Sequence, residues 1–282
     1  MHFTEWEILL VDDEPDVLAA TKLAMKNLKV YGLPLKIHTA SSAAEAKTIM
    51  SQDDAFRHSG IAVALIDVVM ETDDAGLSLC QAIREELGNL SVQLYIRTGQ
   101  PGLAPERDVI DTLNINGYFT KHEATEDKLY TLLKSGIRQY YWIYNNTTLR
   151  QFVNLVMSFP TREAMTVGYN QVLQGQAGLP FGSRRAEVGG TTIGLVDISA
   201  DEAAARVAAM SQMEGMVLDE LGSKYVIGPD DYHLCKIEPS AGQAGVTFLY
   251  QSSIPMPIPN RHMLNSLGKI IGTVWARLPE AG

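Results

Sequence analysis

The sequence predicts an α/β protein: a five-stranded, doubly wound parallel sheet, then a C-terminal α+β domain, joined by a long helix. Residues 7–135 alternate short apolar runs with amphipathic stretches, as successive strand–helix units do. The run "IAVALIDV" at 61–68 is apolar on both faces apart from Asp67, which is typical of a strand covered by helices on both sides. From about residue 136 the alternation gives way to a long helical stretch and a mixed pattern.

Each predicted strand of the first half is followed by a predicted helix. Pro15 suits the first turn of the first helix, Ser42 is a good N-cap for the second, and Gly88 closes the third. The strands are expected at 7–14, 35–40, 61–68, 92–98 and 117–120, and the helices at 15–28, 42–52, 76–88, 104–115 and from 125 onward.

A helix-compatible stretch runs from residue 125 almost to Pro160. We therefore divide the chain into a first domain at 1–135, a helical connector at 136–160 and a second domain at 161–282. The apolar residues of the stretch roughly share one helix face, and two interpretations stay open: a dimerising coiled coil, or docking on the second domain. These residues are Leu129, Leu133, Ile137, Tyr140, Tyr144, Phe152 and Val156.

The second half predicts an α+β domain. Helices are expected at 162–176, 201–222 with a break at Gly215, and 260–278, and strands at 191–199, 224–228, 231–238 and 245–253.

Composition narrows the functional classes. The 282 residues carry a net charge of −10, and both halves are acidic, which disfavours binding to nucleic acid. No run approaches the roughly 20 apolar residues of a membrane span, and the N-terminus lacks a signal-peptide pattern. The two cysteines suggest no disulfide framework, so we expect a cytoplasmic protein.

Charged and polar residues follow the predicted parallel strands, at the edge where doubly wound sheets carry their chemistry. Asp12 and Asp13 end the first strand, Asp67 the third, Thr98 the fourth and Lys121 the fifth. Three carboxylates so close together stay ionised only if they share a cation, and their oxygens suit Mg²⁺. The alternative is that the acids at the strand ends only cap loops. This alternative is disfavoured because Asp12, Asp13, Asp67, Thr98 and Lys121 all stand at successive strand ends.

Such a site can accept a phosphoryl group. Asp67 can act as a carboxylate nucleophile, while Mg²⁺ and Lys121 neutralise charge on the phosphoryl oxygens and Thr98 donates a hydrogen bond to one of them.

The motifs "LLVDDE", "ALIDVVM", "YIRTG" and "GYFTK" resemble the receiver domain of two-component response regulators, a flavodoxin-like fold, over about residues 5–140. The resemblance implies that Asp67 is the phosphoacceptor and that a sensor histidine kinase is its donor. It further implies that Asp12, Asp13, Asp67 and the backbone carbonyl of Val69 hold Mg²⁺, and that Thr98 and Tyr118 form the switch pair.

The sequence departs from the receiver pattern at several positions. His122 follows Lys121 where proline is usual, and Arg97 precedes Thr98 where an aliphatic residue is usual. Gly99 replaces the usual alanine, and the loop "METDDAG" carries extra acids. We expect these changes to alter loop shape and to leave the site groups in place.

The second half ends in a strand, "GVTFLYQSS", and a long closing helix, "RHMLNSLGKIIGTVWARL", and in this it resembles a GAF-like domain. The motifs "VVMETDDAG", "REELGN" and "RTGQPGLAPER" make the chain similar to regulators in which a receiver and a GAF-like domain precede an HD-GYP cyclic-di-GMP phosphodiesterase. By that resemblance, the chain ends where the phosphodiesterase would begin. Because no catalytic motif is found in the second half, we expect a non-enzymatic output and no cofactor besides Mg²⁺. "YHLCK" offers His233 and Cys235 as a weak metal half-site, for which a strand with alternating faces is the simpler interpretation.

Three functions remain to be weighed. The leading hypothesis is a phosphorylation switch that signals to an unknown downstream protein, or through a homodimer formed by the last receiver helix and the connector. The alternative is a small-molecule sensor whose GAF-like domain binds a ligand. A multiple-turnover Mg²⁺ phosphatase is disfavoured, because Val69 stands where such enzymes need a second acid.

Overall fold

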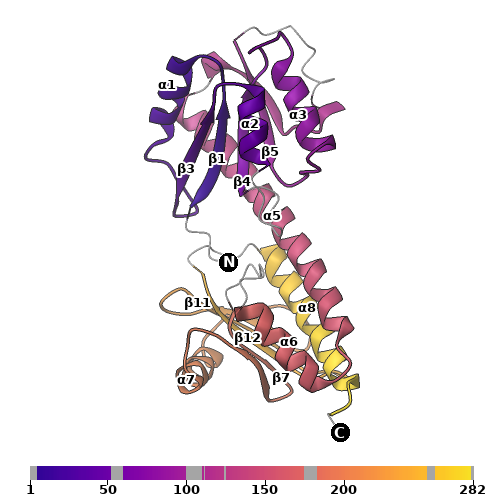
Figure 1. Cartoon of the computed structure of the whole chain (residues 1–282). Helices are drawn as coiled ribbons and strands as arrows, with labels where there is room; N and C mark the ends of the chain where they lie inside the picture. The colour runs from indigo at the N-terminus through magenta and orange to yellow at the C-terminus, as the bar shows by residue number, and fades with distance from the viewer. Residues whose placement is uncertain are drawn as a thin grey trace. The chain divides into compact units, whose positions relative to one another are not determined.

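The structure, a computed structural model, describes residues 5–51, 60–99, 110, 112–123, 125–174, 183–252 and 258–280. The chain divides into two compact units, an N-terminal unit at Phe3–Tyr144 and a C-terminal unit at Asn145–Gly282, and the boundary between them falls within the sequence of helix α5 (Figure 1). The predicted limits at 1–135, 136–160 and 161–282 remain predictions. The helix expected at 104–115 lies mostly outside the described residues. None of the helices described has the length and apolar character needed to span a bilayer.

The N-terminal unit contains the predicted five-stranded parallel sheet. Its strands lie in the order β2-β3-β1-β4-β5-β6, so the five parallel strands follow the flavodoxin-like order 2-1-3-4-5. The α/β fold class predicted for this half is therefore confirmed. The bounds are β1 Trp6–Val11, β2 Lys29–Val30, β3 Leu33–Ala40, β4 Ile61–Asp67, β5 Gln93–Thr98 and β6 Gly117–Thr120.

The sixth strand, β2, was not predicted. It pairs antiparallel with β3 through a two-residue turn at Tyr31 and Gly32, both of which have positive φ. Two successive positive φ values match the right-handed twist of a tight hairpin. The indole N–H of Trp6 donates a hydrogen bond to the Val30 carbonyl at 2.9 Å, which ties β2 to the start of β1.

Helices cover both faces of this sheet, as the apolar strand β4 predicted. Helices α2 (Ala43–Met50) and α3 (Ala75–Glu85) pack on one face (Figure 1). The first part of α5 (Glu126–Ser158) packs on the other, where Gly136 leaves room for Val63 and Tyr95. Helix α1 (Pro15–Met25) begins at its proline, and Ser42 caps α2 through the Glu45 amide, both as predicted.

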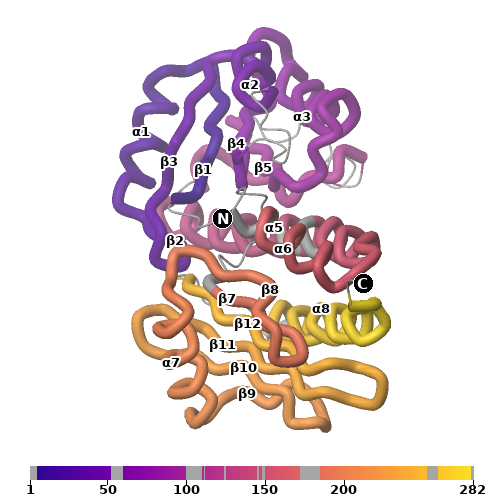
Figure 2. Tube along the Cα trace, turned by 60° about the horizontal axis from the view of Figure 1, so that its bottom comes forward, coloured from indigo at the N-terminus to yellow at the C-terminus, as the bar shows by residue number. Residues whose placement is uncertain are grey.

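The C-terminal unit is built on an antiparallel six-stranded sheet in the order β8-β7-β12-β11-β10-β9 (Figure 2). Helix α7 packs on one face, and α6, α8 and the end of α5 pack on the other. The GAF-like assignment of this unit stays a prediction. The bounds are α6 Arg162–Gln174, β7 Ser183–Val188, β8 Thr191–Leu195, α7 Ala200–Ser211, β9 Met216–Val217, β10 Lys224–Ile227, β11 Tyr232–Ile237, β12 Val246–Gln251 and α8 Ile258–Arg277.

Two strands of this unit were missed. The sequence of β7, "SRRAEV", is too charged to read as a strand, although Ala186 and Val188 are buried. The segment of β9 was placed in a helix that ends at Ser211, where Lys224 donates to the Ser211 carbonyl at 2.5 Å. At Gly215 a Cβ would lie 2.5 Å from the Tyr225 carbonyl, so the chain passes directly against β10 there.

The apolar face of α5 is buried within the two units. Leu129, Leu133 and Ile137 are buried in the N-terminal unit, whereas Phe152 and Val156 belong to the core of the C-terminal unit. This burial favours docking over a coiled-coil seam, because side chains inside a core are unavailable to a second helix. Dimerisation through this helix stays a prediction.

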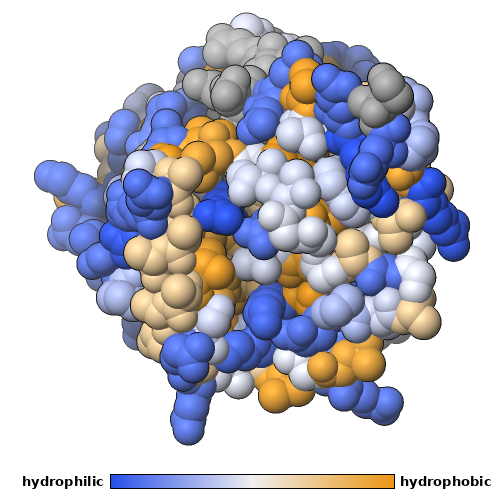
Figure 3. Space-filling model, turned by 90° about the horizontal axis from the view of Figure 1, so that it is seen from below, coloured by the Kyte–Doolittle hydropathy of each residue, from blue (hydrophilic) through white to orange (hydrophobic). Residues whose placement is uncertain are grey.

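Hydrophobic residues on the face shown in Figure 3 form small groups separated by polar ones. Among the described residues of the C-terminal unit, the exposed ones include Met213, Val217, Leu221 and Ile227, around β9 and β10. Scattered exposed apolar residues of this kind are ordinary in soluble domains.

Gly76 should be indispensable to the N-terminal unit. Its amide donates to the Val68 carbonyl at 3.0 Å, and a Cβ there would lie 1.8 Å from the Asp67 backbone oxygen. Gly76→Ala should therefore cost more than about 3 kcal/mol of unfolding free energy, measured by urea titration. Gly99→Ala is the control, because its Cβ would meet only Lys121 at 3.7 Å. Similar stability of the two variants would contradict the close approach.

Candidate functional site

Strand register brings four charged residues to one edge of the N-terminal sheet. Val11 pairs with Ile66, and Asp67 pairs with Arg97. Because side chains alternate along a strand, Asp12, Asp67, Arg97 and Lys121 come to the face that also carries α1 and α5. The edge is formed by the carboxyl ends of the parallel strands, as predicted.

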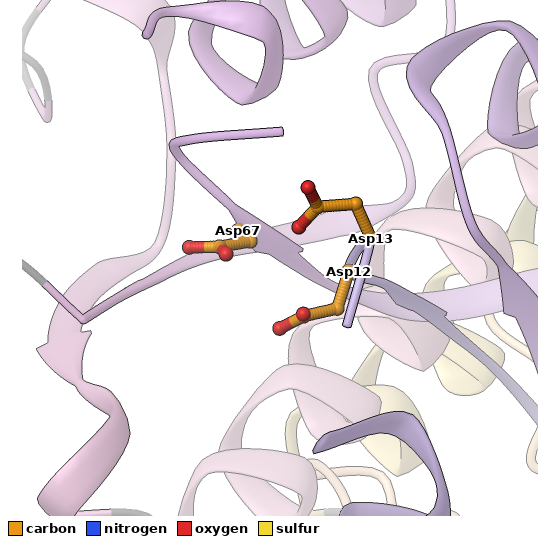
Figure 4. A group of neighbouring side chains, drawn as sticks. All are labelled: Asp12, Asp13 and Asp67. Carbon is orange, nitrogen blue, oxygen red and sulfur yellow. The ribbon is translucent and has the colours of Figure 1, made fainter. Parts of the chain in front are cut away.

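Three carboxylates gather at this edge (Figure 4). Oxygens of Asp12, Asp13 and Asp67 all lie within 4.8 Å of one another. Asp12 and Asp67 are buried, whereas Asp13 is exposed and opens the cluster to solvent. Two buried carboxylates in such proximity require positive charge nearby.

Lys121 supplies part of that charge. Its Nζ lies 2.7 Å from Asp67 Oδ2, 3.0 Å from Asp12 Oδ2 and 2.7 Å from Glu14 Oε1. The second oxygen of Asp67 accepts the Val68 amide at 2.8 Å, so both of its oxygens have hydrogen-bond donors. Glu14, which the sequence did not single out, joins the site through Lys121.

Burial and charge act against each other on these groups. Burial raises the pKa of Asp67, and the nearby charge of Asp12 adds to the rise, while Lys121 and the Val68 amide act to lower it. Burial alone would lower the pKa of Lys121, but its hydrogen bonds to Asp67, Glu14 and Asp12 outweigh burial and raise it. Lys121 therefore stays charged at neutral pH.

The remaining predicted residues lie at or near the same edge. Thr98 is buried at the end of β5, directly after Arg97. Tyr118 pairs with Ile96 and packs against the core beneath α2 and α3. Val69 lies two residues after Asp67 and is partly buried. Their roles as switch pair and as metal-binding carbonyl stay predictions.

Arg97 is the residue that sequence analysis undervalued. It was noted only as a departure from a pattern, yet its side chain is 1% exposed. Its Nη2 donates to Asp12 Oδ2 at 2.8 Å, and its Nη1 donates to Thr21 Oγ1 at 2.6 Å. An arginine inside an otherwise apolar strand was the available signal, because such a charge needs a buried partner.

Two extra acids of the loop "METDDAG" accept hydrogen bonds. Glu71 accepts the Ala43 amide at the start of α2, at 2.9 Å. Asp74 accepts the Thr72 hydroxyl at 2.8 Å.

The donor set fits a hard divalent cation. Carboxylate oxygens are the ligands that Mg²⁺ prefers, and exposed Asp13 leaves a side of the cluster for water. Asp12, Asp13 and Asp67 are the residues that would hold the ion. A bound ion would supply positive charge beside Asp67, in addition to that of Lys121.

The C-terminal unit holds a buried polar group of another kind. His233 lies on β11, with Nδ1 2.7 Å from the Tyr225 hydroxyl and Nε2 3.0 Å from the Ser252 carbonyl. Tyr225 also bonds the Tyr250 hydroxyl. Because both ring nitrogens have partners, the geometry favours the alternating strand over a metal half-site with Cys235.

A pocket of about 310 Å³ lies between α5 and α8 in the C-terminal unit. Helix α5 contributes Asn146, Arg150, Val153 and Asn154 to its lining, and α8 contributes Met263, Ser266, Leu267 and Ile270. The space between the sheet and the helices, by contrast, is filled by the core residues around Tyr169 and Phe248.

No family model matches the chain. A curated protein of Vibrio cholerae serotype O1, 3'3'-cGAMP-specific phosphodiesterase 2, is 46% identical over 141 residues, which are 50% of this chain and 26% of that protein. The chain thus spans about a quarter of that relative's length.

Several solved structures are similar to about half of the chain. The signal receiver domain of an HD domain-containing protein from Pseudomonas fluorescens Pf-5 is 20% identical, with a TM-score of 0.41 over 49% of this chain and 98% of that one. A response regulator receiver protein from Pseudomonas putida is 21% identical, with a TM-score of 0.38 over 47% and 98%. The Mn²⁺-bound form of response regulator Rcp1 is 18% identical, with a TM-score of 0.34 over 46% and 90%.

The prediction of a non-enzymatic output is contradicted by the relative from Vibrio cholerae. The relative from Vibrio cholerae is a phosphodiesterase, and its 46% identity points to an enzymatic output domain. The inference failed because it judged the output from motifs in this chain alone. The match covers 26% of the relative, so a lack of catalytic motifs here excludes nothing.

Replacing Lys121 should lower the free energy of unfolding, because Asp12 and Asp67 would then be buried without its positive charge. Without Lys121 the pKa of Asp67 should rise further, so ionised Asp67 should destabilise the fold. A carboxyl with a raised folded-state pKa favours folding below its unfolded pKa of about 4, and this contribution is lost as pH rises through the folded pKa. The deficit of Lys121→Met should therefore grow above about pH 4, reaching about 3 kcal/mol near pH 7.

Urea titrations in EDTA at several pH values measure this deficit. Lys47→Met is the control, because Lys47 forms an exposed ion pair with Glu86, worth less than about 1 kcal/mol. A deficit that is independent of pH, or equal in both variants, would refute the interpretation.

Proposed function

We propose that the N-terminal unit is a receiver domain of a two-component response regulator, phosphorylated on Asp67 by a sensor histidine kinase with Mg²⁺ bound. The observation that carries the proposal is the buried Asp67 carboxylate, 2.7 Å from Lys121 and within 4.8 Å of Asp12 and Asp13. A nucleophile, a fixed cation and a set of metal ligands meet there at one sheet edge.

The proposed step transfers a phosphoryl group from a phosphohistidine. An oxygen of Asp67 forms a bond to phosphorus, the phosphorus–nitrogen bond breaks, and the leaving imidazole takes up a proton. Lys121 Nζ, already 2.7 Å from Asp67 Oδ2, can turn to the new phosphoryl oxygens and stabilise their charge. Phosphorylation removes the negative charge of Asp67 and adds that of the phosphoryl oxygens above it.

Thr98 and Tyr118 are the proposed switch. Thr98 is buried at the end of the neighbouring strand, where its hydroxyl can turn toward a phosphoryl group on Asp67. Tyr118 lies on β6, on the face of the sheet opposite α5. Its side chain would turn into the space that Thr98 leaves. A shift of a few kcal/mol between two states is sufficient for signalling.

The proposed output is enzymatic. The Vibrio cholerae phosphodiesterase supports a receiver that controls the hydrolysis of a cyclic dinucleotide. The C-terminal unit, for which we propose a GAF-like fold, would transmit the switch, and α5 belongs to both units. A homodimer through α5 is a further proposed route.

Phosphorylation of Asp67 can be tested directly. Acetyl phosphate and Mg²⁺ should add about 80 Da to the wild type, detected by intact mass spectrometry, and EDTA should prevent the addition. Asp67→Asn should abolish it. Asp73→Asn is the matched control, because Asp73 lies in the adjacent loop outside the carboxylate cluster, and it should be modified normally. Equal modification of Asp67→Asn and the wild type would overturn the proposal.

A second candidate function, small-molecule binding by the C-terminal unit, is favoured by the pocket between α5 and α8. Arg150 and two asparagines, together with four apolar side chains in the same lining, suit a compact ligand with an anionic group. The pocket lies between two helices of the C-terminal unit.

The pocket can be tested with 8-anilinonaphthalene-1-sulfonate, whose rings suit its apolar side chains and whose sulfonate suits Arg150. Ile270→Trp should fill the pocket and reduce the affinity about tenfold, measured by fluorescence titration. Ile227→Trp places the same change on exposed β10, away from the pocket, and should have no effect. Equal affinities of the two variants would exclude the pocket as the site.

A further inference from the structure

Arg97 connects α1 to the carboxylate cluster. The Thr21 hydroxyl donates to the Val17 carbonyl at 2.7 Å, within α1, and accepts from Arg97 Nη1 at 2.6 Å. Nη2 of the same guanidinium donates to Asp12 Oδ2 at 2.8 Å. The helix thus orients the arginine, and the arginine orients Asp12.

Protein donors engage both oxygens of Asp12. Oδ2 accepts from Arg97 and lies 3.0 Å from Lys121 Nζ, and Oδ1 accepts the Glu14 amide at 3.0 Å. A divalent cation that uses Asp12 must therefore compete with these donors. Lys121 can move away, since it is partly exposed, but Arg97 is enclosed and held by Thr21.

Positive charge beside Asp12 also weakens the binding of a divalent cation. Arg97 carries a positive charge that is spread over a planar guanidinium. It places a second permanent positive charge beside Asp12, next to the one on Lys121. Repulsion between that charge and an incoming divalent ion weakens binding, and it acts strongly because water is excluded.

We propose that Arg97 is a built-in counter-ion of Asp12 that holds this carboxylate in place when no metal is bound and lowers the affinity of the site for Mg²⁺. Arg97 is thus a positioning residue that makes phosphorylation depend on high Mg²⁺. The inference rests on the metal site of the proposed function. It concerns binding, so it can be tested without phosphoryl transfer.

The test is the dissociation constant of Mg²⁺ for the full chain, measured by isothermal titration calorimetry. Arg97→Met should bind Mg²⁺ about tenfold more tightly than the wild type, and Arg97→Lys, which keeps the charge, should stay closer to the wild type. The Arg97→Met protein without metal should unfold at a lower temperature, and Mg²⁺ should raise its Tm more than that of the wild type.

Arg84→Met is the matched control. Arg84 belongs to the same unit and is partly buried, but its guanidinium donates to the carbonyls of Asn89, Val92 and Asn114. It should leave the Mg²⁺ affinity unchanged. An equal gain in Arg84→Met would show a mere effect of net charge and would overturn the inference.

Thr21→Val keeps the inference testable if Arg97→Met does not fold. It retains both charges and frees the guanidinium from α1, so Mg²⁺ affinity should rise about two- to threefold. Unchanged or weaker Mg²⁺ binding by Arg97→Met would refute the inference. If that variant does not fold, the same result for Thr21→Val would refute it. Absence of Mg²⁺ binding by every variant would refute it as well. Phosphorylation of the wild type with unchanged Arg97→Met affinity refutes the inference alone. Tighter binding by Arg97→Met without modification of Asp67 refutes the proposed function alone.

Discussion

The ion pairs of Lys121 are the interaction on which the carboxyl edge of the N-terminal sheet depends. Asp67 ends a strand whose seven residues are all buried, so its charge has little access to water. Nζ of Lys121 lies within 3.0 Å of both Asp67 and Asp12, and it belongs to the short segment that follows β6. The acids and the lysine thus lie at the ends of three different strands, β1, β4 and β6, so they meet only when the sheet has formed.

The same charge balance gives the site its chemical character. A buried carboxylate whose negative charge is fully neutralised by protein cations would be a poor nucleophile. A buried carboxylate with no positive charge nearby would take up a proton. Asp67 lies between these limits, because burial and Asp12 raise its pKa while Lys121 opposes them. Asp13, exposed beside the buried pair, leaves the cluster open on one side.

The parallel sheet and the positions of Asp12, Asp67 and Lys121 could be predicted from sequence because they follow from strand periodicity. The features that were missed depend on contacts distant in sequence. Strand β7 has a charged sequence and is defined mainly by its pairing with β12 and β8. Arg97 has significance only through Asp12 and Thr21, 85 and 76 residues away. The proposal of an enzymatic output comes from similarity to a longer protein and from no motif in this chain.

The hairpin formed by β2 has a consequence for association of the chain. An open sheet exposes unpaired backbone groups along its outer strands, and long, flat outer strands attract other chains. Here the outermost strands are β2, with two residues, and β6, with four. The eight-residue strand β3 is therefore partly covered on its outer side by β2, which Trp6 holds through its indole N–H. Short outer strands give a second chain little backbone to pair with, so the sheet is protected against edge-to-edge aggregation.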